Sequence, residues 1–117
     1  MNRALPAGIV ATVEAACAER QPEPREVVAI LRQLPPYTHR AIADVASITG
    51  YAYGTVSALR WLAARVPASV QRDDLSLRHH FAVARLAPAE QRRRLAEAAA
   101  EKLSSDALRE RIAKAAL

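Results

Sequence analysis

Apolar residues recur every three or four positions along most of the chain, which is the spacing of one face of an α-helix. Prolines and a glycine interrupt this pattern, and since proline lacks the N–H that a helix interior needs, we expect a helix boundary at each interruption. The pattern predicts an all-α fold, a compact multi-helix domain that contains a helix-turn-helix. About seven helices are expected, over residues 6–20, 24–34, 38–50, 52–65, 77–86, 88–102 and from 105 onward.

Three segments follow from this order of helices. Residues 1–36 form a predicted helical hairpin, residues 37–66 form the helix-turn-helix, and residues 67–117 supply three further helices that pack on it. The chain contains 27 alanines, so each helix buries little apolar area, at roughly 25 cal/mol per Å². A second copy would extend such a thin core. We therefore expect a homodimer, with the first segment as the candidate dimerisation element.

Composition excludes several classes of protein. The single cysteine, Cys17, cannot form an internal disulfide, and neither a cysteine zinc site nor any other metal site is indicated. Charged residues interrupt every apolar run before it reaches the roughly 18 residues that a membrane helix needs. The first residues also lack the pattern of a secretion signal. We expect a cytoplasmic protein with no membrane partner and no cofactor.

The net charge of +5 is concentrated in one window of the sequence. Residues 60–94 carry eight arginines against three acidic residues, whereas the segments before and after this window are neutral. The planar guanidinium of arginine suits phosphate oxygens, so the window favours an anionic partner such as a nucleic acid. A codon bias toward arginine, on a helix face that is merely solvated, is the alternative interpretation.

The most informative stretch is residues 42–61, IADVASITGYAYGTVSALRW. Ala46 is small where two helices would touch, and Gly50, four residues later, can adopt the left-handed backbone of a tight turn. Val56 then turns the apolar face of the second helix onto the first. Thr49 occupies a position where an apolar residue is usual, and the neighbouring Ile48 could fill that place. The alternative is an ordinary helical hairpin with a glycine at its turn.

In a helix-turn-helix, the second helix enters the major groove with its N-terminal residues outward. Hydroxyl side chains there can hydrogen-bond to base edges or phosphates, while glycine and alanine allow close approach or contact a thymine methyl. The predicted base-reading residues are Ala52, Tyr53, Gly54, Thr55, Ser57 and Ala58. The predicted phosphate contacts are Thr38, Arg40, Arg60, Arg65, Arg72, Arg78 and His79.

The second half of the chain resembles a known family. The shared features are TGYAYGT at the start of the second helix, Trp61, the step from Arg65 to Pro67, and the run LSLRHHFAVARL. These features are similar to the LmbU-like transcriptional regulators of actinomycete antibiotic gene clusters, and more distantly to the helix-turn-helix domains of ParB-type partition proteins and plasmid repressors. Residues 1–36 have no counterpart in the resemblance, and Leu103 stands where we expect a tryptophan. The resemblance implies sequence-specific DNA binding and transcriptional control.

The residues that could suggest catalysis or metal binding have simpler interpretations. His79 and His80 are adjacent, and adjacent helical residues point about 100° apart, which is poor geometry for one ion. We expect one of them to be buried and hydrogen-bonded and the other to lie near a phosphate. Cys17 lies in an apolar stripe, where its thiol should be inert, and Glu97 and Glu101 are interpreted as a solvated face. No enzyme is predicted.

Together these features predict a transcriptional regulator that binds a two-fold-related operator in double-stranded DNA as a homodimer. RNA polymerase is a further candidate partner. Two alternatives stay open at this point. One is a helical protein-binding adaptor or anti-repressor whose basic window meets an acidic partner. The other is nonspecific binding to chromosomal DNA, which needs the charge but no operator.

Overall fold

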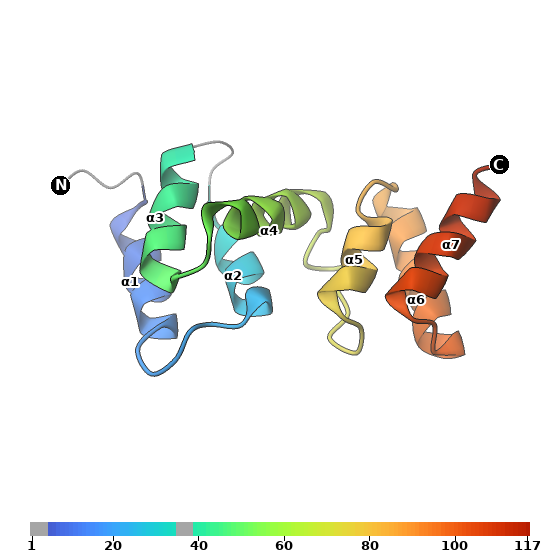
Figure 1. The fold of residues 1–117 in the computed structure, drawn as a ribbon, viewed down its shortest axis with the longest axis horizontal. Coiled ribbons are helices and arrows are strands. Elements are labelled where there is room, and N and C mark those ends of the chain that lie inside the picture. The colour runs from blue at the N-terminus through green and yellow to red at the C-terminus, as the bar shows by residue number, and fades with distance from the viewer. Residues whose placement is uncertain (1–4, 35–38) are drawn as a thin grey trace. The chain divides into compact units, whose positions relative to one another are not determined.

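The computed structural model describes residues 5–34 and 39–117. Within these residues every regular element is a helix and no strand occurs, which confirms the predicted all-α class. The helices, labelled in Figure 1, are α1 (Ala7–Ala16), α2 (Pro24–Leu31), α3 (His39–Thr49), α4 (Tyr53–Arg65), α5 (Leu77–Val83), α6 (Pro88–Glu101) and α7 (Ser105–Ala115).

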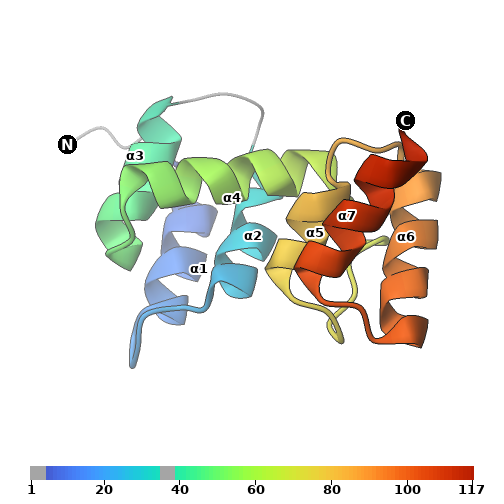
Figure 2. The same cartoon turned by 45° about the vertical axis from the view of Figure 1, so that its right-hand side comes forward.

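The chain forms two compact units, Met1–Ala64 and Arg65–Leu117. In the first unit, α1 packs against both α2 and α3. Figure 1 and Figure 2 show that α4 crosses the direction of these three helices rather than running alongside them. The core of this unit consists of fully buried aliphatic side chains from all four helices, namely Val13, Val27, Leu31, Val45 and Val56.

A tight turn between α3 and α4 directs α4 across the unit. Gly50 has a φ of +83°, a left-handed conformation that costs residues with a Cβ, and its N–H donates to the carbonyl of Ala46. Thr49 is buried, with only 5% of its surface exposed, and its hydroxyl donates to the carbonyl of Val45 at 2.7 Å. Thr49 itself thus fills the position that we expected Ile48 to fill. It can do so because the helix backbone satisfies its hydroxyl.

The segment between α1 and α2 is tied to this turn by side chains. The amide nitrogen of Gln21 donates to the carbonyl of Thr49 at 3.1 Å. The hydroxyl of Tyr51 donates to the carbonyl of Pro22 at 2.6 Å. These two bonds join positions 28 and 29 residues apart in the sequence, so they fix the turn against the rest of the first unit.

In the second unit, α5 packs against both α6 and α7, and two histidines hold it there. His80 is 1% exposed, and its Nε2 accepts a hydrogen bond from the backbone N–H of Arg72 at 3.0 Å. Its Nδ1 therefore carries the ring hydrogen and donates to the carbonyl of Ser76 at 2.7 Å. This confirms that one histidine of the pair is buried and hydrogen-bonded. His79 joins Ser76 in a capping box at the start of α5, and its Nε2 lies 2.8 Å from the carbonyl oxygen of Leu103.

Gln91 is fully buried on α6, and its side-chain amide lies next to three backbone carbonyls of the second unit. Its amide nitrogen lies 2.9 Å from the carbonyl oxygen of Arg65, 3.3 Å from that of Ala84 and 3.0 Å from that of Leu86. Carbonyls at helix ends have no partner within the helix, and buried ones are costly when unsatisfied. Gln91 therefore does for these carbonyls what water does at an exposed helix end.

We predict opposite effects on stability for two glycine substitutions. Gly50→Ala should lower the free energy of unfolding by about 1–2 kcal/mol, because alanine is strained at positive φ. Space is not the cause, since the nearest atom to an added Cβ is the Gln21 amide nitrogen at 3.5 Å. Gly54→Ala, in α4 with open space around it, should instead raise stability by about 0.5–1 kcal/mol. Urea unfolding followed by circular dichroism measures both, and equal effects would contradict the turn geometry.

Gln91→Met keeps the length of the side chain but removes its hydrogen bonds. We expect this variant to lose about 1–3 kcal/mol of stability, because it leaves buried carbonyls without a donor. The matched control is Arg92→Met, an exposed neighbour on the same helix, which should change stability by less than about 0.5 kcal/mol. Thermal and urea unfolding compare the two, and a Gln91→Met protein as stable as the control would refute this role.

Candidate nucleic-acid interface

The start of α4 presents small and polar side chains to solvent. Of the six predicted base-reading residues, five are exposed and Ser57 is half-buried. Tyr53 has 42% of its surface exposed, although large apolar and aromatic side chains elsewhere in the described chain are mostly covered. The exposed members are Ala52, Tyr53, Gly54, Thr55 and Ala58.

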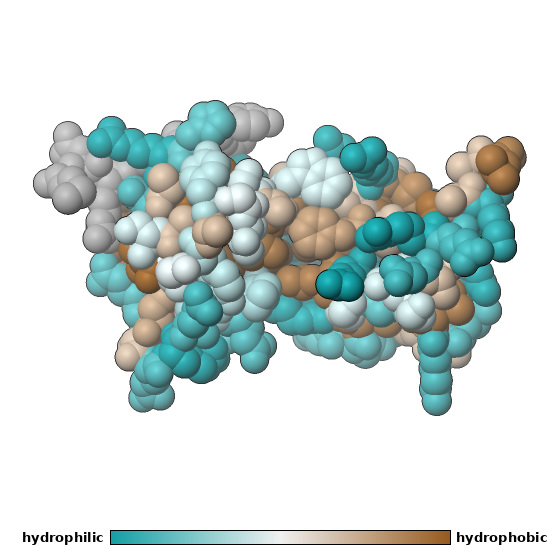
Figure 3. All heavy atoms as spheres, in the orientation of Figure 1, coloured by the Kyte–Doolittle hydropathy of each residue, from teal (hydrophilic) through white to brown (hydrophobic). Residues whose placement is uncertain are grey.

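The exposure follows from the register of α4. Its buried positions are Val56, Leu59, Leu62 and Ala63, which recur at helical spacing and bind the helix to the first unit. Tyr53, Gly54 and Ala58 lie away from this side of the helix and face outward, whereas Thr55, in the first turn of α4, is exposed on the same side as Leu59 and Leu62. Figure 3 shows pale, weakly polar side chains over the beginning of α4. This face therefore offers hydroxyl groups for hydrogen bonding, and apart from Tyr53 its exposed side chains are short.

His39, the first residue of α3, belongs to this surface and was not predicted. Its Nδ1 lies 2.9 Å from the hydroxyl oxygen of Tyr53, and both side chains are exposed. The two residues are 14 positions apart, and no spacing rule in the sequence indicates their contact. The hydrogen bond restricts the directions in which the Tyr53 hydroxyl can point.

The phosphate contacts predicted on and next to α3 and α4 flank this surface along the chain. Arg40 is exposed on α3, Arg60 is half-buried on α4, and Arg65 is exposed at the last position of α4. Thr38 lies outside the residues that the structure describes. Arg40, Arg60 and Arg65 are the positions at which phosphate contacts of a duplex that approaches α4 can be tested.

The predicted phosphate contacts in the second unit differ in whether other groups of the same unit already neutralise or hydrogen-bond them. Arg72 makes two hydrogen bonds to the carboxylate of Asp74, at 2.9 and 2.8 Å, and this guanidinium lowers the pKa of Asp74. His79 uses both ring nitrogens inside its own unit, on Ser76 and Leu103, so no ring N–H is left for a phosphate. Arg78, in contrast, is exposed and forms no ion pair with another described residue.

Several further arginines of the basic window are also compensated. On α6, Arg93 pairs with Glu90 and with Glu97, and Arg94, whose side chain is 12% exposed, lies beside the same two carboxylates. The neighbouring Arg93 guanidinium lowers the pKa of Glu90. The excess of arginine over acidic residues in the sequence therefore overstates the charge that this window offers to a partner.

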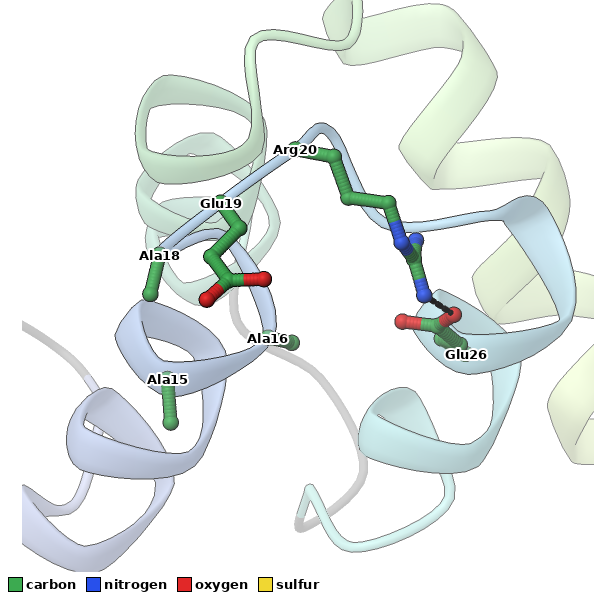
Figure 4. A pocket seen from close by; sticks show the side chains of 6 residues that line it. All are labelled: Ala15, Ala16, Ala18, Glu19, Arg20 and Glu26. Atoms are coloured by element: carbon green, nitrogen blue, oxygen red, sulfur yellow. Dashed lines mark hydrogen bonds and ion pairs between the residues drawn. The ribbon is translucent and has the colours of Figure 1, made fainter.

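A shallow depression lies between the end of α1 and the start of α2, with a volume of about 310 Å³. Figure 4 shows Arg20 reaching along it to an ion pair with Glu26, while the carboxylate of Glu19 points over the small alanines that line the rest.

Cys17, next to this depression in the sequence, is not a reactive thiol. Burial, together with the negative charges of Glu14 and Glu26, raises the pKa of its thiol and so favours the unreactive protonated form. Among the described residues, no three histidine, cysteine or acidic side chains are grouped as metal ligands.

No family model, curated protein or solved structure matches the chain. Within the described ranges, none of the helices combines the length and the apolar character needed to traverse a lipid bilayer.

The separation of α4 into a packing face and an open face can be tested with two neighbouring residues. Val56→Ala should lower the free energy of unfolding by about 2 kcal/mol, because it empties a fully buried position. Thr55→Ala, one residue earlier and exposed, should change it by less than about 0.5 kcal/mol. Denaturant titrations of both variants provide the comparison, and a large loss for Thr55→Ala would place that side chain in the core.

Proposed function

We propose that the protein is a sequence-specific double-stranded DNA-binding regulator of transcription that inserts the start of α4 into the major groove. The observation that carries this proposal is the exposure of the hydroxyl and small side chains at the start of α4, on a helix held in place by its opposite, apolar face. A helix that is polar and open at its N-terminal end, and follows a tight turn from a packed helix, has the layout by which helix-turn-helix proteins read DNA.

Each exposed side chain has a defined chemical use in this arrangement. The hydroxyls of Tyr53, Thr55 and Ser57 can bond to base edges, and the Tyr53 hydroxyl is oriented by His39. Gly54 and Ala58 permit close approach, and the Ala58 methyl can contact a thymine methyl. None of these groups forms the two-pronged contact that arginine makes to guanine. We therefore expect modest discrimination from each recognition helix.

Affinity beside the recognition helix would come from Arg40 and Arg60 of the first unit and from Arg65 at the end of α4, placed against phosphates on either side of the groove. Because one recognition helix covers little DNA, we further propose that two copies of the chain bind two half-sites related by two-fold symmetry. The resemblance to LmbU-like regulators supports the same function, and contact with RNA polymerase would be one route to transcriptional control.

The proposal can be tested by selecting sequences that the full chain retains from a random pool of duplex DNA. Anisotropy titrations then compare the selected duplex with a scrambled one over a salt series. We expect the selected duplex to bind at least about 10³-fold more tightly, and log K to fall by about 0.9 per phosphate contact for each unit of log salt. Tyr53→Ala and Thr55→Ala should each reduce the preference about tenfold.

Two controls separate base reading from general charge. Arg60→Gln should weaken both duplexes alike, and Thr12→Ala, the same chemical change as Thr55→Ala on an exposed position of α1, should leave both affinities unchanged. A pool without enriched sequences would overturn the proposal. So would a protein that ignores DNA but is retained by an acidic partner, since that result would favour an adaptor.

A further inference from the structure

The two units carry unequal charge. Residues 1–64 contain six basic and five acidic residues, a net charge of +1, whereas residues 65–117 contain eleven basic and seven acidic residues, a net charge of +4. The unit that holds the exposed start of α4 is thus almost neutral. Most of the electrostatic attraction that the chain can offer to a polyanion lies in the other unit.

Within the second unit, internal ion pairs use the charge of four arginines. Arg72 pairs with Asp74, Arg93 and Arg94 with Glu90 and Glu97, and Arg111 with Glu101 at 2.7 Å. These arginines are matched by carboxylates that would have to be released or repelled if a phosphate approached. A phosphate contact in this unit is expected elsewhere.

Besides the separate exposed residues Arg92, Lys102 and Arg109, uncompensated charge lies on α5 and the turn that follows it. Arg78 and Arg85 are exposed, and neither forms an ion pair with another described residue. They are seven residues apart, close to two helical turns, and Ala84 keeps helical dihedrals (φ −60°, ψ −26°), so both lie on the side of α5 opposite the buried His80 and Val83.

The sequence around this face contains no negative charge. Residues 75–89 include no aspartate or glutamate, and α5 is anchored on its buried side by the two hydrogen bonds of His80. In Figure 3, strongly hydrophilic side chains gather over α5 and the neighbouring part of α7. Arg78 and Arg85 thus extend from a rigid support, with no carboxylate on the segment to compete for them.

We propose that the Arg78–Arg85 face of α5 binds the phosphate backbone of duplex DNA, as a second contact separate from α4 that supplies affinity without reading sequence. This inference rests on the proposed function, and it assigns specificity to the first unit and most of the salt-dependent affinity to the second. Arginine forks suit phosphate oxygens, and two arginines on one side of α5 and its following turn present positive charge to the repeated negative charge of a DNA strand.

The test measures the affinity of the full-length chain for the selected duplex and for a scrambled duplex over a salt series. Because the proposed complex contains two copies, Arg78→Gln and Arg85→Gln should each reduce the salt slope by about 1.8, or about 0.9 per copy, and weaken both duplexes about 60-fold at 0.1 M salt. The double variant should lose about twice as much slope, and the ratio of the two affinities should stay as in the wild type. Circular dichroism checks that the variants remain folded.

Arg93→Gln is the matched control, because it removes the same charge from an exposed arginine of the same unit that is already paired. It should leave the salt slope unchanged. Equal losses for Arg93→Gln and Arg78→Gln would show that only net charge matters and would overturn the inference. If the wild type prefers its selected duplex and the double variant binds DNA as tightly as the wild type, the inference would also be overturned. Salt-dependent binding that needs Arg78 and Arg85 but shows no sequence preference would instead uphold this contact and overturn the proposed function.

Discussion

The left-handed backbone at Gly50 is the constraint on which the rest of the first unit depends. α3 ends and α4 starts within three residues, and the positive φ of Gly50 is what lets so short a connection change direction. A turn so short could still swing, but Gln21 and Tyr51 bond it to the segment between α1 and α2. The conformational freedom of glycine and these two long-range bonds together define where α4 lies.

Once α4 has this direction, its helical periodicity decides which of its residues are exposed to solvent. Val56 and Leu59 must be buried to close the core, and the helical repeat then leaves Gly54 and Ala58 outside. The burial of one face and the exposure of the other are therefore two consequences of one register. A change that rotated α4 would move apolar residues outward and hydroxyls inward at the same time.

In the second unit, the geometry of ion pairs decides how much arginine charge is open to a partner. Eight arginines in one window suggest a continuous basic surface, yet carboxylates on α6 and beside Arg72 neutralise several of them. Those carboxylates are close in sequence, at spacings of two to four residues, but spacing alone does not say which side chains meet. Arg78 and Arg85 form a smaller positive face on α5 and its following turn. His80 accepts a hydrogen bond from the backbone N–H of Arg72, and Gln91 of α6 donates to the carbonyl of Leu86, so both ends of this segment are bonded to the rest of the unit.

The sequence by itself determined the helices and their order, because apolar periodicity and proline positions act within a few residues of the chain. It also determined the turn, since only glycine adopts a φ of +83° at little cost. The tertiary structure alone decided the burial of Thr49, the contact of His39 with Tyr53, and the use of both His79 nitrogens within one unit. Most of these features join side chains from different elements, whose separation in space depends on how the whole unit packs and leaves no local trace in the sequence.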